Sequence, residues 1–480
     1  AMSRYTIEYS RDRGPQGASG STDASAITSG TVAFERLPIG ATSTTVTVGN
    51  DSRILASVQT VTSRATLLAS TASYLRWPAD EGGDFKLSSD QDSDADNVLR
   101  IERNDGTIVE RVWDGVNFFA EWVPLSLANS WGTPIVNGDK LASAITMTPN
   151  GATLHLKPNT TYNVDFPMRP TRDVRIAGNG ATIKRSAQRS SLLTQNSNSG
   201  TSTVTVTDAS VFRVGMRAFV VKTAGVVGGH AMVNGTSVFA GSSGFLIESI
   251  SGNTVTLGGT LQQNCVTGNK LLAYDSLVLN DSATAHVVIV DCIFDGDRDN
   301  HDDVLDWAAG YGVALSTATI QRCRFINMPN ECMTIGSGSI IDCTSEDCWG
   351  SFFHASNAVQ ANSRGILIQN CYTKNTNTKN NGHDEGVITF SAQSQNIRVR
   401  DCVFDNSAGT KGQGVFGLLD SDSSADYDQN FFAENVVAEN FGTILTMSSS
   451  QSVAPVVFDR IHLSKCTFTT CGSLTITGKD

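Results

Sequence analysis

The sequence predicts an all-β protein whose main domain is a right-handed, single-stranded parallel β-helix, preceded by small N-terminal β modules. Three observations lead to this prediction. Charged residues make up only 17% of the chain and glycine supplies 43 of its 480 residues, a composition that favours strands and turns over helices. A unit of roughly 30 residues recurs through the C-terminal half, in the range of solenoid repeats. Six of the ten cysteines fall at the same place in that unit.

Length and charge exclude several classes of protein. At about 150 residues per domain, the chain is long enough for about three domains. Its net charge of −12 opposes contact with phosphate backbones and anionic lipid, so we expect no nucleic-acid partner and no membrane insertion. No stretch is long and apolar enough to span a bilayer, and residues 2–7 lack the apolar core of a signal peptide. We expect a soluble chain that is not addressed to the secretion machinery.

The first 73 residues are interpreted as an N-terminal β segment. Residues 14–22 contain three consecutive Gly-X-Y triplets, which fit either a flexible Gly/Ser linker or a short collagen-like trimer neck. Alternating strands between turn residues then predict a small β module; they are expected at residues 30–34, 44–51 and 57–61.

Residues 74–136 are interpreted as a second small β module and a neck. Residues 98–101 and 108–112 form a plausible hairpin about the Asp-Gly of residues 105–106. The acidic run at residues 90–96 is interpreted as a solvated loop. A calcium site is the alternative, and it is disfavoured because the carboxylates lack the spacing of an EF-hand. No other cofactor and no other metal is expected.

From residue 137 to residue 480 the pattern changes to that of a strand stack. A short helical pattern at residues 138–149 leads into strands near 152–156, 162–164 and 174–178, which predicts a helix capping the β-helix. Residues 203–261 interrupt the stack with a hairpin-like pattern of their own, and we interpret them as an inserted β subdomain.

The recurring unit consists of an alternating strand, a cysteine, a polar turn and a second strand. Stacked coils about 4.8 Å apart place like residues over like, so the cysteines are expected to form an internal column of small buried thiols. A zinc site and disulfides between coils are the alternatives, but zinc ligands usually come in closely spaced cysteine pairs. The expected column consists of Cys292, Cys323, Cys343, Cys371, Cys402, Asn435 and Cys466.

The chain resembles bacteriophage tailspike and capsule-depolymerase proteins with a pectate-lyase-like β-helix. Residues 82–85 and 108–117 look like the segment that precedes the β-helix in that family. Residues 151–162 are similar to its first strand and turn, and residues 177–183 and 294–300 complete the resemblance. Residues 118–124 depart from the family, because they replace its usual sequence at the start of the β-helix.

The resemblance implies a homotrimer on a virion tail that acts at the host bacterial cell surface. Its N-terminal segment would attach to other tail or baseplate proteins, and its β-helix would bind and usually cleave a capsule, O-antigen or exopolysaccharide. We therefore expect an endo-acting glycoside hydrolase. A polysaccharide lyase on the same fold and a tail fibre or adhesin that only binds glycan are the alternatives.

Acidic residues at the heads of successive strands are the catalytic candidates. Glycoside hydrolysis uses two carboxylates about 5 to 9.5 Å apart, a distance that neighbouring coils can supply on the outer wall. The catalytic candidates are Asp303, Asp306, Glu331, Asp384 and Glu385, with Glu331 or Glu385 preferred as the acid. The candidates for binding substrate are His301, Trp307, His354, His383 and Asp420. Of these, His301 and His383 are expected in exposed loops, and packing is the favoured alternative role of His354.

Overall fold

A computed structural model describes two compact parts of the chain, within residues 1–112 and 113–480, and each is considered by itself. In neither part do the described helices include one long and apolar enough to cross a membrane. The described residues are 58–72, 74–77, 83–88, 91, 96, 98–123, 137–221, 245–261, 264–273, 275–280, 285–301, 310–355, 365–378, 386–390, 396–407, 412–420, 430–449, 460–472 and 475–477.

The first part contains a five-stranded sheet packed on a short helix, α2 (Arg64–Leu68). The predicted hairpin is confirmed, since β4 and β5 pair in antiparallel fashion across the turn at Gly106. Its core includes Leu67, Leu75, Phe85 and Val109. The strands, in sheet order, are β1 (Val58–Thr60), β2 (Tyr74–Trp77), β3 (Gly83–Leu87), β5 (Ile108–Arg111) and β4 (Arg100–Glu102).

The module boundaries differ from those expected at residues 74 and 136. The sheet begins earlier, because β1 pairs in parallel with β2 and its Val58 lies opposite Tyr74. It ends at Arg111, and β6 (Asn117–Phe119) already pairs in parallel with β7 (Thr153–His155) of the following stack. The β-helix therefore starts about 20 residues before the expected position. The candidate collagen-like triplets lie outside the described residues.

The predicted capping helix is confirmed as α3 (Lys140–Met147), which begins directly after the 3₁₀ turn η4 (Asn137–Asp139). Its Leu141, Ala144 and Ile145 are buried. A second 3₁₀ turn, η3 (Ala120–Trp122), lies on the same end of the stack and is in contact with α3. The helix thus covers apolar side chains that the first coil would otherwise leave open.

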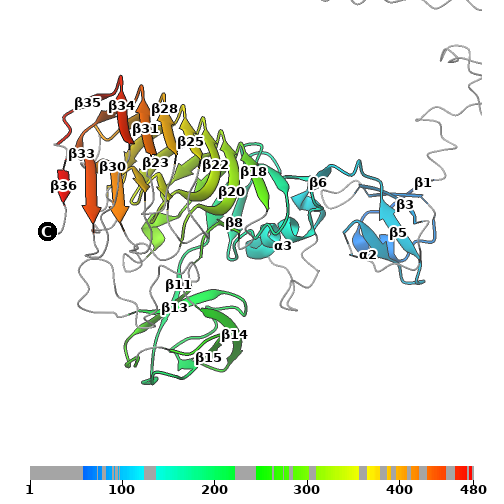
Figure 1. Cartoon of the computed structure of the whole chain (residues 1–480). Coiled ribbons are helices and arrows are strands. Elements are labelled where there is room, and N and C mark those ends of the chain that lie inside the picture. The colour runs from blue at the N-terminus through cyan, green and yellow to red at the C-terminus, as the bar shows by residue number, and fades with distance from the viewer. Residues whose placement is uncertain are drawn as a thin grey trace, which may run out of the picture. The chain divides into compact units, whose positions relative to one another are not determined.

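The second part is a parallel β-helix whose strands form three rows, here called rows 1, 2 and 3 (Figure 1). Row 1 contains β17 (Val278–Leu279), the first halves of β20 (Val313–Gln321) and β22 (Met333–Ile341), β24 (Phe353–Ala355), β27 (Ile388–Phe390), β30 (Gly412–Asp420), β33 (Phe441–Ser449) and β36 (Thr475–Thr477). Row 2 contains β6, β7, β9 (Val174–Ala177), β18 (His286–Val290), the second halves of β20 and β22, β25 (Ile366–Gln369), β28 (Ile397–Arg400), β31 (Asn430–Glu434) and β34 (Arg460–Ser464).

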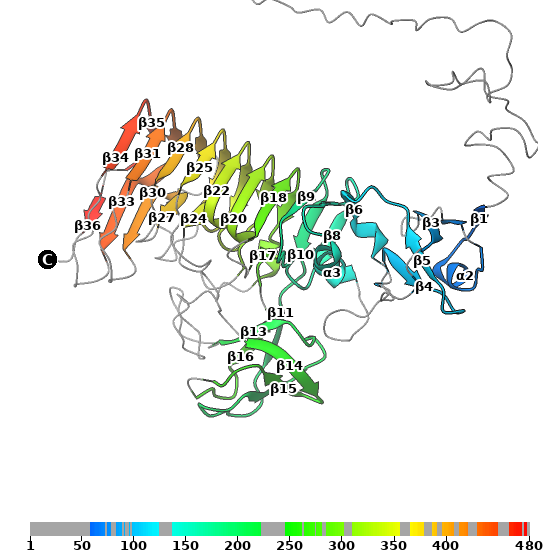
Figure 2. The ribbon, with the colours of Figure 1, turned by 45° about the vertical axis from the view of Figure 1, so that its right-hand side comes forward.

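Row 3 contains nine parallel strands among the described residues (Figure 2). All strand pairs within the three rows are parallel, so the predicted parallel β-helix is confirmed. The strands of row 3 are β8 (Thr161–Val164), β10 (Thr182–Arg185), β19 (Ile293–Asp295), β21 (Arg324–Ile326), β23 (Thr344–Cys348), β26 (Tyr372–Thr376), β29 (Val403–Asp405), β32 (Val437–Glu439) and β35 (Thr467–Thr469).

The predicted column of thiols is confirmed at the corner between rows 2 and 3. The six cysteines of the column, all within the described residues, form no disulfide, and five of them are buried. Cys343 Sγ lies 3.5 Å from the carbonyl oxygen of Ile320 in the preceding coil. Burial raises the pKa of the Cys323 and Cys343 thiols well above the ordinary value, so these side chains act as small apolar groups.

The column was expected to contain Asn435 between Cys402 and Cys466, and this prediction was wrong by one residue, because Val436 occupies the position. Arg400 pairs with Glu434, and Val437 N–H donates to the carbonyl of Cys402, so Val436 lies over Cys402. Asn435 instead lies over Asp401, and its Nδ2 donates to Asp401 Oδ1 at 2.8 Å. The physical reason is that this turn residue adopts a left-handed conformation with φ of 54°, which asparagine and aspartate tolerate better than most residues.

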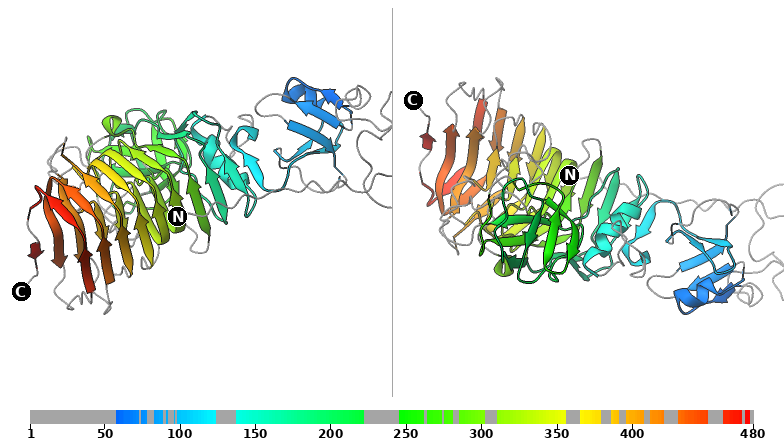
Figure 3. Two further views of the ribbon diagram at one scale, coloured as in Figure 1. Left: turned by 90° about the horizontal axis from the view of Figure 1, so that it is seen from above. Right: turned by 90° about the horizontal axis from the view of Figure 1, so that it is seen from below.

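The inserted subdomain is a small antiparallel barrel. Its six strands pair in the order β11-β16-β13-β14-β15-β12, and a bridge between Leu193 and Val206 joins the two ends. The predicted insertion is confirmed, but it spans residues 189–273 and not 203–261, because β11 and β16 both belong to its sheet. Figure 3 shows the barrel in green. The strands are β11 (Arg189–Leu192), β12 (Thr203–Thr205), β13 (Arg217–Val221), β14 (Phe245–Ser251), β15 (Thr254–Leu257) and β16 (Lys270–Ala273).

The first coil contains a histidine whose protonation opposes folding. His155 Nε2 lies 2.7 Å from Asn117 Oδ1, and its ring stacks on Phe119 with 5.0 Å between centroids. Burial and the neighbouring Arg175 guanidinium lower the pKa of His155 below its ordinary value of 6.5, against an opposing effect of Asp114. At pH values below 6.5, His155 of the unfolded chain binds a proton more readily than His155 of the folded chain. The contribution of His155 to stability is therefore complete at pH values above 6.5 and is lost as the pH falls below it.

His155→Gln is therefore expected to lower the melting temperature most at neutral pH and progressively less at acidic pH. The measurement is thermal unfolding of parent and variant from about pH 8 to about pH 5. His286→Gln, which replaces an exposed histidine on β18, serves as the control. A difference between parent and His155→Gln that stays constant across this range contradicts the assignment.

Candidate active site

The heads of the row 1 strands are stacked one coil above another. Gly312 N–H donates to the carbonyl of Glu331, Cys332 N–H to that of Ser351, and Phe353 N–H to that of Val387. Asp303 and Asp306 precede the first of these heads in sequence, and Asp384 and Glu385 precede the head at residue 386. These four aspartate and glutamate residues themselves lie outside the described residues, as do Trp307 and His383.

A carboxylate and an imidazole meet on this stack. Glu331 lies two residues before β22, and His354 is the middle residue of β24, one coil further on. Glu331 Oε1 is 3.2 Å from His354 Nδ1, the Glu331 side chain is 0% exposed, and the His354 side chain is 13% exposed. We call this pair the Glu331–His354 dyad.

The dyad corrects the expectation that Glu331 stands on the outer wall. Its side chain is fully buried, and the coil above passes close over its backbone at Gly350. A Cβ added at Gly350 would lie 2.7 Å from the backbone nitrogen of Glu331, which leaves no room for a side chain between the two coils. Of the two dyad side chains, only that of His354 is open to solvent.

The same contact recurs one coil further with hydroxyl groups. Ser351 Oγ lies 3.1 Å from Thr389 Oγ1, and it donates to the carbonyl of Gly386 at 2.6 Å. Ser351 occupies the position of Glu331, and Thr389 pairs with His354 in the β24–β27 register. The fold therefore brings the position of Glu331 or Ser351 into contact with that of His354 or Thr389 in the next coil. Of these two contacts, that of Glu331 with His354 is the one in which both side chains can bind and release a proton.

His301 was expected in an exposed loop, and this expectation was wrong, since it is only 9% exposed. It follows the 3₁₀ turn η6 (Arg298–Asn300) and lines a pocket whose other wall includes Met216 and Arg217 of the barrel. The barrel residues reduce its access to solvent. Asp420 is the last residue of β30, where its backbone pairs with Ser449.

The acidic run, interpreted as a solvated loop with a calcium site as the alternative, can be assessed only at Asp96, its one described acidic residue. Asp96 Oδ1 accepts hydrogen bonds from the backbone N–H groups of Val98, Leu99 and Arg100 at 2.7, 2.7 and 2.9 Å. This oxygen therefore closes a backbone turn before β4. No group of three or more candidate metal ligands occurs among the residues that the structure describes.

The pairing of Glu331 with His354 was missed at the level of sequence, although a signal for it exists. The step from Cys323 to Cys343 is 20 residues, and the same step carries Thr334 onto His354. Glu331 precedes Thr334 by three residues, so its contact with His354 joins adjacent coils but lies three positions away from the strand register. The periodicity places the two residues in adjacent coils, but the contact depends on the bend of the chain at the corner.

The chain was compared with protein-family models, with curated proteins and with solved structures. No protein-family model matches the chain, and no curated protein matches it in sequence. Among solved structures, the tailspike of Acinetobacter baumannii bacteriophage Fri1, a capsular polysaccharide depolymerase, is 9% identical, with 87% of this chain and 70% of that chain covered and a TM-score of 0.38.

Two further structures are similar to this chain at comparable levels. The tailspike of Pseudomonas phage LKA1 is 12% identical, with coverage of 75% of this chain and 76% of that chain and a TM-score of 0.28. A polygalacturonase from Erwinia carotovora is 10% identical, with coverage of 72% and 94% and a TM-score of 0.32. These are the classes of protein that the sequence resembles, while the parallel β-helix itself is shown by the strand pairing.

Proposed function

We propose that this chain cleaves a bacterial surface polysaccharide by endo-glycosidic hydrolysis, as the depolymerase of a phage tailspike. The observation that carries the proposal is the contact between Glu331 Oε1 and His354 Nδ1 at 3.2 Å. Rows of parallel strands present their side chains at steps of about 4.8 Å, so a linear polymer can bind across several coils beside this dyad.

Within the dyad, we assign His354 the proton transfer and Glu331 the positioning of the imidazole. A buried carboxylate that contacts Nδ1 fixes the orientation of the ring and stabilises its protonated form. The partly exposed His354 is then able to protonate the glycosidic oxygen as the bond breaks. This replaces the expected role of Glu331 as the direct proton donor, because its carboxylate is enclosed.

Hydrolysis also requires a carboxylate that acts on the sugar or on water. We assign it to Asp384 or Glu385, because the two residues directly precede Gly386 in sequence. The carbonyl of Gly386 accepts a hydrogen bond from Ser351, in the coil next to that of Glu331. Asp303 and Asp306, which precede Gly310, are the alternatives. The side chains proposed to contact the sugar are His301, Trp307, His383 and Asp420.

The proposal includes the biological setting that the resemblance implies. The chain would act as a homotrimer on a virion tail at the host cell surface, with its N-terminal segment bound to other tail or baseplate proteins. Analytical ultracentrifugation of the full chain tests the trimer. A monomer at micromolar concentration argues against this part of the proposal.

The activity is tested by incubating the full chain with capsular, O-antigen and exopolysaccharide preparations and following polymer length by size-exclusion chromatography. Hydrolysis yields shorter chains with new reducing ends. Shorter chains that carry the ultraviolet absorbance of an unsaturated uronate identify a lyase and contradict hydrolysis. Saturable binding with no shortening of the polymer identifies a binding protein and overturns the enzymatic proposal.

A further inference from the structure

A pocket lies where the inserted barrel joins the β-helix. Its walls come from the ends of β8 and β10 in row 3, from β11, β13 and β16 of the barrel, and from residues 275–277 and 301. The volume open to the centre of a water molecule is about 40 Å³, which is room for a few waters or one carboxylate-sized group. The polar side chains in its lining include Asp165, Arg185, Arg189, Arg217, Asp275 and His301.

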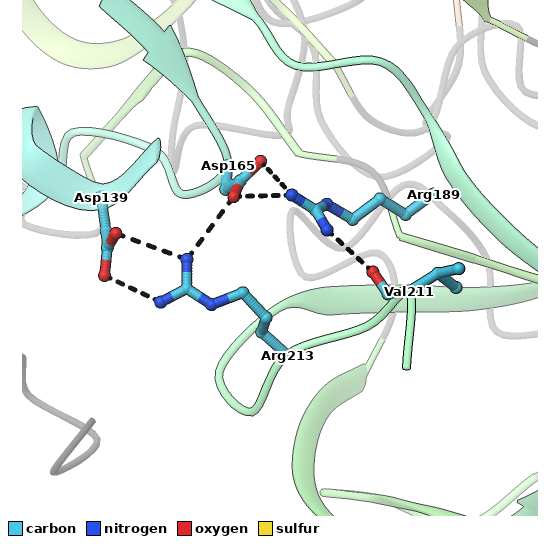
Figure 4. A network of polar contacts seen from close by, with 5 residues as sticks. All are labelled: Asp139, Asp165, Arg189, Val211 and Arg213. Carbon is cyan, nitrogen blue, oxygen red and sulfur yellow. Dashed lines mark hydrogen bonds and ion pairs between the residues drawn. The ribbon is translucent and has the colours of Figure 1, made fainter. Parts of the chain in front are cut away.

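One side of the pocket is held by paired charges (Figure 4). Arg189 Nη2 donates to both carboxylate oxygens of Asp165 at 2.8 Å, and its Nη1 donates to the carbonyl of Val211 at 3.0 Å. Arg213 donates to both oxygens of Asp139 at 3.0 and 3.3 Å, and its Nη1 reaches Asp165 Oδ2 at 3.5 Å. Bidentate pairs of this kind are rigid, so they fix the barrel on the first coils.

The other side is richer in guanidinium groups than in carboxylates. Asp275 Oδ2 is shared between Arg169 Nη2 at 3.1 Å and Arg217 Nε at 3.4 Å. The geometry of the second contact does not make a hydrogen bond, and the buried Arg217 Nε forms none with the residues that the structure describes. Arg185 is 5% exposed, and its Nη2 donates to the carbonyls of Gly310 and Tyr311.

The local charge is opposite to that of the whole protein. Among the described side chains, the lining contains three arginines and two aspartates, which leaves an excess of one positive charge in a chain whose net charge is −12. A guanidinium group presents five N–H donors in a planar fork that matches a carboxylate. The pocket therefore combines the size and the donor geometry for a small anionic group.

We infer that this pocket binds the carboxylate of an acidic sugar, which would make the preferred substrate an acidic polysaccharide. The inference rests on the proposed function for the sugar part of the ligand. The pocket is connected to the dyad by a short stretch of chain, since the carbonyls of Gly310 and Tyr311 bind Arg185 and the next residue, Gly312, donates to the carbonyl of Glu331. A sugar acid held there lies at the start of the row 1 stack that carries the dyad.

The test is calorimetric titration of the full chain with glucuronate, glucose and acetate at low salt. Glucuronate is expected to bind, and glucose and acetate to bind at least about tenfold more weakly, because each lacks one half of the ligand. Arg217→Gln is expected to lower the affinity for glucuronate at least about tenfold. Arg217→Lys, which keeps the charge, is expected to lower this affinity less. Arg322→Gln removes an arginine paired with Asp291 at a coil corner outside the pocket lining and is expected to change nothing.

Acetate that binds as tightly as glucuronate overturns the sugar assignment, and an unchanged glucuronate affinity in a folded Arg217→Gln overturns the site. Circular dichroism and the melting temperature establish that each variant is folded. The outcome is separable from that of the proposed function. Failure to bind glucuronate with polysaccharide cleavage intact rejects only the pocket, whereas glucuronate binding without cleavage of any polysaccharide rejects only the enzymatic proposal.

Discussion

Glu331→Gln is expected to lower the turnover of polysaccharide by about 10²- to 10⁴-fold while changing KM little. Glutamine retains nearly the same shape, so the packing under Gly350 is kept, but it removes the negative charge beside His354 Nδ1. An imidazole that must carry a proton during the reaction then loses its stabilising partner. The measurement is the initial rate of reducing-end formation against substrate concentration, which separates kcat from KM.

The control for this variant is Ser351→Ala. Ser351 occupies the same position one coil further and makes the corresponding contact with Thr389 through uncharged groups. Its loss is expected to lower turnover far less than Glu331→Gln does, because it removes only uncharged contacts, including the hydrogen bond to the carbonyl of Gly386. A folded Glu331→Gln with full turnover contradicts the role of the dyad. Equal losses in both variants indicate that the position matters for packing and not for proton transfer.

The largest expected effect on stability comes from Gly338→Ala, in the middle of β22. Gly338 pairs with Ala318 of β20 and has φ of 121°, a backbone conformation that residues with a Cβ rarely adopt. An added Cβ would lie 1.9 Å from the carbonyl oxygen of Ala318. Backbone strain and collision together are expected to lower the free energy of unfolding by about 3 kcal/mol or more.

Gly365→Ala provides the matched comparison for this effect. Gly365 also has positive φ, at 68°, but an added Cβ there meets nothing within 4 Å. Its substitution is expected to cost about 1 kcal/mol from backbone strain alone. The measurement is the denaturant midpoint and the melting temperature of both variants. Equal losses of stability would show that the close approach of β20 to β22 contributes nothing.

The repeat could be predicted from the sequence because each coil must bury the same kind of residue at the same corner. Cys292, Cys323 and Cys343 recur at that corner since small side chains fit between stacked coils. The error at Asn435 arose because the cysteine is replaced by valine in that coil. Without the cysteine, the polar turn residue beside Val436 was taken as the member of the column.

The boundaries were less predictable because they depend on pairing between distant segments. The small sheet includes β1 only through its pairing with β2, and the barrel includes β11 only through its pairing with β16. Neither pairing leaves a local pattern in the sequence. Strand pairing of this kind is decided by which segments the rest of the chain brings together.

The amino-acid sequence by itself determined the class of this protein, a coiled stack of parallel strands with a capping helix and an insertion, because periodicity, turn residues and small buried side chains are local properties. The tertiary structure alone decided that Glu331 is enclosed and faces His354, and that arginines from the barrel and from row 3 share one pocket. These are contacts between coils and between subdomains, and their distances depend on how closely backbones approach. That approach is set at positions such as Gly350, where the packing of one coil on the next leaves no space for a side chain.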